Sequence, residues 1–184
     1  LPDTGKVADA GCGSGILSLM IAQRCNLPVT GIEIDDEAAE TARNNSRKSP
    51  WNHQVSIITD DFTNFCQQTN HRFTLVISNP PWFKGDLASS DKKRSLARKG
   101  DTLKLNSLIT GAWQILTEEG RIAVIIPVSK FDAFHHKATS QGFMLERRCE
   151  VSDRPGSAAK RVLLSYTNIP PKEITDDVII LKNA

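Results

Sequence analysis

The tetrapeptide Asn79-Pro80-Pro81-Trp82 contains the residues of this sequence that most clearly suggest chemistry. Two consecutive prolines stiffen the backbone and leave their carbonyl oxygens as acceptors. The side-chain oxygen of Asn79 and the carbonyl of Pro80 can accept both N–H hydrogens of an amino group whose lone pair is delocalised, such as N6 of adenine. These bonds would aim the lone pair at an electrophile, and Trp82 offers a face on which a flat base can stack. The tetrapeptide therefore predicts group transfer to an exocyclic amino nitrogen, without a strong base.

A glycine-rich segment near the start of the chain predicts a nucleotide site. Gly11, Gly13 and Gly15 follow a short apolar run, and they allow a sharp turn and a close approach of the backbone to a ligand. Glu33 ends the next apolar run, twenty residues after Gly13. A carboxylate at that point can accept hydrogen bonds from both ribose hydroxyls.

The charges around this segment favour S-adenosylmethionine over a dinucleotide. Ile16 stands where a dinucleotide fingerprint needs a third glycine. Asp9, two residues before Gly11, would repel a pyrophosphate but suits the cationic sulfonium and amino group of the methyl donor. Asp61 could accept a hydrogen bond from the donor's adenine, with Asp60 as the competing candidate. Phe62 would then form an apolar wall of the same site.

The spacing of apolar residues predicts alternating strands and helices, hence a doubly wound, mostly parallel α/β fold. Two further strands, separated by Pro155-Gly156 with no helix between them, should pair as an antiparallel C-terminal pair. Ligands bind at the carboxyl ends of strands in such folds, so Asn79 is expected to border the donor as well as the target. We expect strands at 6–10, 29–34, 55–59, 73–78, 121–126, 143–151, 161–167 and 178–181, and helices at 14–24, 36–48, 62–67, 102–116 and 130–141.

Composition excludes several classes of protein. The chain has 184 residues, 39% hydrophobic and 24% charged, which fits one domain over 1–184 with a short C-terminal extension at 170–184. No apolar run is long enough for a membrane span. The histidines lack metal-ligand spacing, so no metal is expected. The four cysteines form no CxxC pair, which indicates reduced thiols in a cytoplasmic protein; they are Cys12, Cys25, Cys66 and Cys149.

Charge is distributed unevenly along the chain. Residues 1–78 carry six Lys/Arg against nine Asp/Glu, whereas residues 79–184 carry seventeen against twelve. A long irregular stretch at 79–101 contains the densest basic run, which suits a polyanion such as RNA, although a solvated loop is the plainer interpretation. Its basic residues are Lys92, Lys93, Arg94, Arg98 and Lys99.

The glycine segment and the Asn-Pro-Pro-aromatic tetrapeptide together resemble the class I S-adenosylmethionine-dependent amino-methyltransferases. Four further segments, at 45–51, 72–83, 116–120 and 160–164, are similar to the bacterial valine-tRNA adenine-N6-methyltransferases, which modify the adenine 3′ to the anticodon. The similarity extends from about Val7 to Tyr166. It implies a Rossmann-like fold and a target-base role for Asn79 to Trp82. The donor-site roles that it implies fall on Asp9, Gly11, Gly13, Glu33 and Asp61.

The resemblance also has departures. The family usually has Tyr after Pro-Pro, where this sequence has Trp82, which can stack but offers an indole N–H. Family members begin a few dozen residues earlier with a segment that helps to cover the donor, so we expect that lid to be missing from this sequence.

The sequence thus predicts methyl transfer from S-adenosylmethionine to N6 of adenine in RNA, with tRNA(Val) as the expected substrate and a monomeric enzyme. Two alternatives stay open. A protein glutamine-N5 methyltransferase needs the same pair of acceptors for an amide nitrogen. A methyltransferase-like RNA-binding protein without activity would keep the fold alone.

Overall fold

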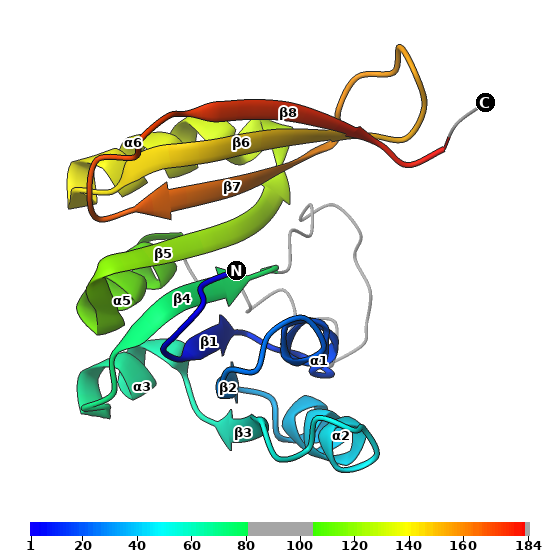
Figure 1. The fold of residues 1–184 in the computed structure, drawn as a ribbon, viewed down its shortest axis with the longest axis vertical. Helices are drawn as coiled ribbons and strands as arrows, with labels where there is room; N and C mark the ends of the chain where they lie inside the picture. Colours follow the sequence, from blue (N-terminus) through cyan, green and yellow to red (C-terminus); the bar gives the residue numbers. More distant parts are fainter. Residues whose placement is uncertain (81–104, 183–184) are drawn as a thin grey trace, which may run out of the picture.

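The computed structural model describes residues 1–80 and 105–182, which form an eight-stranded mixed sheet flanked by helices (Figure 1). The strand order is β3-β2-β1-β4-β5-β7-β6-β8. The strands are β1 (Val7–Ala10), β2 (Val29–Glu33), β3 (Val55–Thr59), β4 (Phe73–Ser78), β5 (Leu116–Pro127), β6 (Met144–Ser152), β7 (Arg161–Thr167) and β8 (Thr175–Ile180).

Most of the helices lie within two residues of their predicted bounds. They are α1 (Ile16–Ala22), α2 (Asp36–Arg47), α3 (Phe62–Gln68), α5 (Leu105–Ile115) and α6 (Phe131–Gln141), with a short 3-10 helix, η2 (Val128–Lys130), before α6. The first three residues of the helix predicted at 102–116 lie outside the described residues.

The topology confirms the predicted fold class. β1 pairs in parallel with both β2 and β4, so the strand order reverses at β1. β7 is antiparallel to β5 and to β6, which confirms the C-terminal antiparallel pair. β8 then adds to β6 in parallel at the sheet edge, beginning at Thr175 instead of the predicted residue 178.

The start of β5 differs from the prediction. The strand begins at Leu116, directly after α5, and not at Arg121. Its pairing with β4 shifts from Phe73 opposite Leu116 to Leu75 opposite Arg121, so the intervening residues form a bulge. A bulge inserts extra residues without ending a strand, and the polar residues 117–119 conceal it from a hydrophobicity pattern.

Successive residues of the central strands face opposite layers of the core. Leu75, Val76 and Ile77 are all buried, as their apolar run predicts for a strand covered on both faces. Val76 belongs to the cluster under α3, α5 and α6, whereas Leu75 and Ile77 belong to the cluster under α1. The two layers hold the central strands rigidly, and their carboxyl ends carry the residues of the candidate site.

Candidate donor and target-base site

The glycine-rich loop joins β1 to α1 and is held over the end of β2. Gly11, Gly13 and Gly15 have φ values of 71°, 55° and 79°, a region that residues with a Cβ rarely adopt. The backbone N–H groups of Gly11 and Cys12 donate to the carbonyl of Ile32 at 2.9 and 3.1 Å. The loop is therefore fixed by backbone bonds to the neighbouring strand.

Gly15 and Gly13 have different structural roles. A Cβ on Gly15 would lie 3.1 Å from the Cβ of Ala42, so Gly15 allows α2 to approach the loop. The side-chain amide of Asn45 also binds α2 to the loop, because it donates to the Ser14 carbonyl at 2.9 Å. A Cβ on Gly13 would meet nothing within 4 Å. Gly13 thus borders open space, as expected of a residue that a ligand approaches.

Glu33 lies at the end of β2 with its carboxylate directed at this loop. Its Oε2 accepts from the Gly13 N–H at 2.8 Å, and its Oε1 accepts from the Asp35 N–H at 3.0 Å. Each carboxylate oxygen can accept more than one bond, so Glu33 retains capacity for hydroxyl donors. Ile34 beside it is 57% exposed and offers an apolar surface for a flat ring. Ile34 is not recognisable as a site residue from the sequence, because an apolar residue at a strand end gives no sign of its exposure.

Asp9 is a buried carboxyl with an unmet acceptor. It is 1% exposed, its Oδ2 accepts from the Ser18 hydroxyl at 2.6 Å, and its Oδ1 has no hydrogen-bond partner among the described residues. Burial raises the pKa of Asp9 to about 6, against the smaller lowering effect of the bonds from Ser18. A cationic ligand group beside Oδ1 would satisfy the acceptor and stabilise the charge. Ser18 was missed from the sequence, because its bond to Asp9 joins two different elements.

The residues that follow β3 have structural contacts of their own. Asp61 caps α3, since its Oδ1 accepts from the N–H groups of Thr63 at 2.8 Å and Asn64 at 3.4 Å. Phe62 is 2% exposed and lies in the core under α5, which leaves little of its ring for a ligand. The backbone N–H of Asp60 donates to the Glu33 carbonyl at 3.0 Å, which brings this segment beside β2. The choice between Asp60 and Asp61 at the donor adenine stays a prediction.

The end of β4 is fixed to the end of β1. The buried hydroxyl of Ser78 donates to the Ala10 carbonyl at 2.7 Å, and Ile77 stands opposite Asp9 in the parallel register. Asn79 follows as an exposed residue, and Pro80 is buried. Ser78 was not predicted as a positioning residue, and the chain offers no local signal for it. Pro81, Trp82 and the basic run (Lys92, Lys93, Arg94, Arg98 and Lys99) lie outside the described residues.

The parallel strands therefore gather two carboxylates and an amide at their carboxyl-terminal ends. Asp9 on β1, Glu33 on β2 and Asn79 after β4 all come from strands that neighbour the point where the strand order reverses. This is where ligands bind in open α/β sheets. Two carboxylates suit a ligand with a cationic group and vicinal hydroxyls, and an exposed amide oxygen beside them suits an amino group.

Other classes of chemistry find no support in the described residues. Burial raises the pKa of the Cys12 thiol to about 12, so this cysteine in the glycine loop stays protonated and is not a nucleophile. The ranges 1–80 and 105–182 hold no group of His, Cys, Asp and Glu that could bind a metal ion. In the same ranges, no helix has the length and apolarity needed to cross a membrane.

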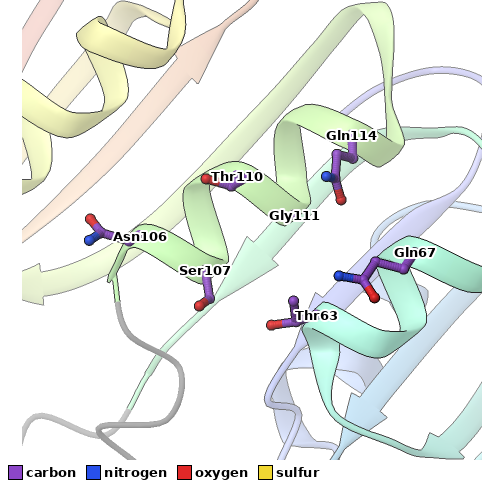
Figure 2. A pocket seen from close by; sticks show the side chains of 7 residues that line it. All are labelled: Thr63, Gln67, Asn106, Ser107, Thr110, Gly111 and Gln114. Atoms are coloured by element: carbon purple, nitrogen blue, oxygen red, sulfur yellow. The ribbon is translucent and has the colours of Figure 1, made fainter.

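A separate hollow of about 230 Å³ lies between α3 and α5. Figure 2 shows the side chains that line it. Its described lining residues carry hydroxyl and amide side chains and no charged group, and none of the described site residues (Asp9, Glu33, Asp61 or Asn79 among them) is part of that lining. Its lining residues are Thr63, Gln67, Asn106, Ser107, Thr110, Gly111 and Gln114.

Comparison with known proteins identifies the family. Residues 1–136 match the family model described as the methyltransferase small domain. This chain belongs to the methyltransferase small domain family. The match includes Asp9, the glycine loop, Glu33 and Asn79, so the candidate site is part of a methyltransferase domain.

Several relatives of this methyltransferase share a name. The chain is 35% identical to a tRNA1(Val) (adenine(37)-N6)-methyltransferase of Bacteroides fragilis (strain YCH46), over 90% of this chain and 70% of the relative. It is 38% identical to one of the same name from Cronobacter sakazakii, over 95% of this chain and 72% of the relative. These relatives confirm the family resemblance drawn from the motifs.

Solved structures support the fold of this methyltransferase. A predicted O-methyltransferase of Agrobacterium tumefaciens superposes with a TM-score of 0.77 at 21% identity, covering all of this chain and 84% of that one. A methyltransferase of Pyrococcus furiosus gives 0.67 at 19% identity, covering 91% and 77%. The class I methyltransferase fold is thus confirmed.

Proposed function

We propose that this chain transfers a methyl group from S-adenosylmethionine to N6 of adenine 37 in tRNA1(Val). The observation that carries the proposal is Asn79, an exposed amide at the end of β4, on the strand that pairs with β1, whose Asp9 and the neighbouring Glu33 of β2 supply two carboxylates. The names of relatives that are 35–38% identical support the choice of RNA and of adenine 37.

The two carboxylates and the glycine loop fit the methyl donor. The orphaned Oδ1 of Asp9 would accept from the donor's amino group, whose charge offsets the burial of the carboxylate. Glu33 would accept from the ribose hydroxyls, and Gly13 leaves room for the donor to approach the loop. When bound, S-adenosylmethionine supplies an electrophilic methyl group on a positively charged sulfur.

The target base would be held by acceptors at the end of β4. The Asn79 side-chain oxygen and the Pro80 carbonyl would accept the two N6 hydrogens, so that the nitrogen's lone pair points at the methyl group. The hydroxyl of Ser78 keeps this segment against β1, which fixes the acceptors relative to the donor loop. Positioned acceptors of this kind act in the transition state without a change in protonation. We further propose that Trp82 stacks on the adenine.

The test is methyl transfer from labelled S-adenosylmethionine to in vitro transcribed tRNA1(Val), with a transcript that carries guanine at position 37 as the comparison. Label should enter the first RNA and not the second. Asn79→Ala should lower turnover by about 100-fold or more, the scale for removing a transition-state hydrogen-bonding group. Donor affinity, measured by calorimetry, should change little.

Asn64→Ala is the matched control, because Asn64 is an exposed asparagine on α3 whose contact with Asp61 uses only its backbone. That variant should keep wild-type turnover. Equal labelling of both transcripts, or an Asn79→Ala variant with wild-type turnover, would contradict the proposal. Label entering a purified release factor instead of RNA would favour the glutamine-N5 alternative.

A further inference from the structure

Five basic residues gather at one end of the strands β5 to β8. We name this set the basic rim. All of its members are exposed, and they come from η2, from the segment between β6 and β7, from the first residue of β7, and from the segment after β8. The basic rim consists of Lys130, Arg154, Lys160, Arg161 and Lys182.

Backbone bonds bring these distant segments together. The Val128 N–H donates to the Lys160 carbonyl at 3.2 Å, which connects η2 to the segment before β7. The Lys182 N–H donates to the Asp153 carbonyl at 3.1 Å, which connects the end of β8 to the segment after β6. Arg161 stands opposite Pro127 at the end of β5. The rim is therefore a product of the strand order, and it is not a run in the sequence.

The rim carries a positive charge that its own acid does not cancel. Residues 153–161 contain three cations and one carboxylate, Asp153. Lys160 forms an ion pair with Asp153. The pKa of that carboxyl is lowered, first by the hydrogen bond from Lys160 and also by the charges of Lys182 and Arg154. Several cations thus surround one acid, and an excess of positive charge faces solvent.

The rim lies at the same end of the strands as the candidate site, where the parallel strands have their carboxyl termini. β5 runs parallel to β4, so the ends that lead to η2 and to Asn79 point the same way. β7 begins opposite the end of β5, and β6 and β8 end beside it. In Figure 1 the segment between β6 and β7 and the end of β8 lie on the side towards which β4 points. Strands are about 4.8 Å apart, and the rim residues belong to the four strands that follow β4 in the sheet order, so they lie about 5–20 Å from β4 across the sheet.

We propose that the basic rim binds the phosphate backbone of the RNA whose base enters the site. This inference rests on the proposed function, because it assigns a further part of the same RNA substrate to described residues. Lysine and arginine side chains bind phosphate oxygens through charge-assisted hydrogen bonds, and such contacts fix the position of a nucleic acid without reading its sequence. At this distance, the rim suits phosphates that flank the target nucleotide.

The test measures binding of transcribed tRNA1(Val), by fluorescence anisotropy, to the wild-type chain and to Lys130→Gln/Arg154→Gln/Arg161→Gln at several salt concentrations. These three positions leave the Lys160–Asp153 ion pair intact. Each lost contact should reduce the slope of log affinity against log salt by about 0.7–0.9, hence by about 2–3 for the triple variant.

Arg24→Gln/Lys48→Gln/Lys172→Gln is the matched control, because it removes the same net charge from exposed positions. Arg24 and Lys48 follow the carboxyl ends of α1 and α2, and Lys172 precedes β8. The control variant should retain the wild-type slope of log affinity against log salt. Thermal unfolding should show both triple variants folded.

An unchanged slope in the rim variant, an equal loss in the control, or no RNA binding by the wild type would overturn the inference. The outcome is separable from that of the proposed function. Rim-dependent RNA binding without methyl transfer would contradict the proposed activity and support the role of the rim. Methyl transfer with no effect of the rim variant on RNA binding would support the proposed activity and contradict the role of the rim.

Discussion

Asp9 should destabilise the donor-free protein at neutral pH, and Asp9→Asn should remove that penalty. Burial raises the pKa of Asp9 from 3.8 to about 6. The folded state therefore binds the proton more tightly than the unfolded state does. Below about pH 4, Asp9 is protonated in both states and its contribution to stability is fully present. As the pH rises from about 4 towards 6, the unfolded chain releases the proton first, so the free energy of unfolding falls. Above that range, the folded protein bears the full cost of the buried charge.

The size of the effect follows from the shift. About two pKa units correspond to about 3 kcal/mol at pH 7.5. Asparagine keeps an acceptor for the Ser18 hydroxyl but places an NH₂ group where Oδ1 has no partner among the described residues. An unmet buried donor costs about 1–3 kcal/mol, so the net gain at pH 7.5 should be about 1 kcal/mol. The cost of the unmet asparagine donor does not depend on pH. The advantage of Asp9→Asn should therefore grow by about 2 kcal/mol between pH 4.5 and pH 7.5.

Urea denaturation of the donor-free wild type and variant at both pH values measures this difference. Asp3→Asn, at an exposed carboxyl, is the control and should not show the pH-dependent gain. At pH 7.5, calorimetry should show that Asp9→Asn weakens donor binding by about 1.5–3 kcal/mol, the scale for a bond to a charged group. A variant whose advantage is equal at both pH values would refute the account of Asp9 as a buried, costly charge. Undiminished donor affinity would refute its role in binding.

Three further variants test neighbouring parts of the site. Glu33→Ala should weaken donor binding in calorimetry by about 1.5–3 kcal/mol, and an unchanged affinity would exclude its carboxylate from the donor site. Ser78→Ala should lower the free energy of unfolding in urea by about 1–3 kcal/mol and also reduce turnover, whereas wild-type turnover would show that its bond does not position the acceptors. Gly15→Ala should destabilise the protein more than Gly13→Ala, since both have positive φ but only a Cβ on Gly15 would crowd Ala42. Gly13→Ala should instead weaken donor binding, and the reverse ranking in urea and calorimetry would contradict the different roles assigned to the two glycines.

Sequence alone determined the fold class and the order of nearly all the elements. Apolar periodicity located the strands and helices because burial of one or both faces imposes it. The glycine loop, Glu33 and Asn79 could be singled out as candidates because they lie at or directly after the ends of predicted strands, and parallel strands bring their carboxyl ends together. Asp35 caps α2, since its side chain accepts from the Ala38 N–H, and an aspartate directly before a helix is a residue type that favours this role.

Tertiary structure decided what depends on contacts between distant segments. The bulge in β5 arises from its register with β4. The buried bond from Ser18 to Asp9 spans nine residues and that from Ser78 to Ala10 spans 68, so no local pattern encodes either. Phe62 was expected to line the donor site, yet its ring lies in the core because α5 packs over it, and only the packing of two helices could determine that. The basic rim likewise exists because β8 joins β6 and β7 joins β5, which places charges from four segments on one edge.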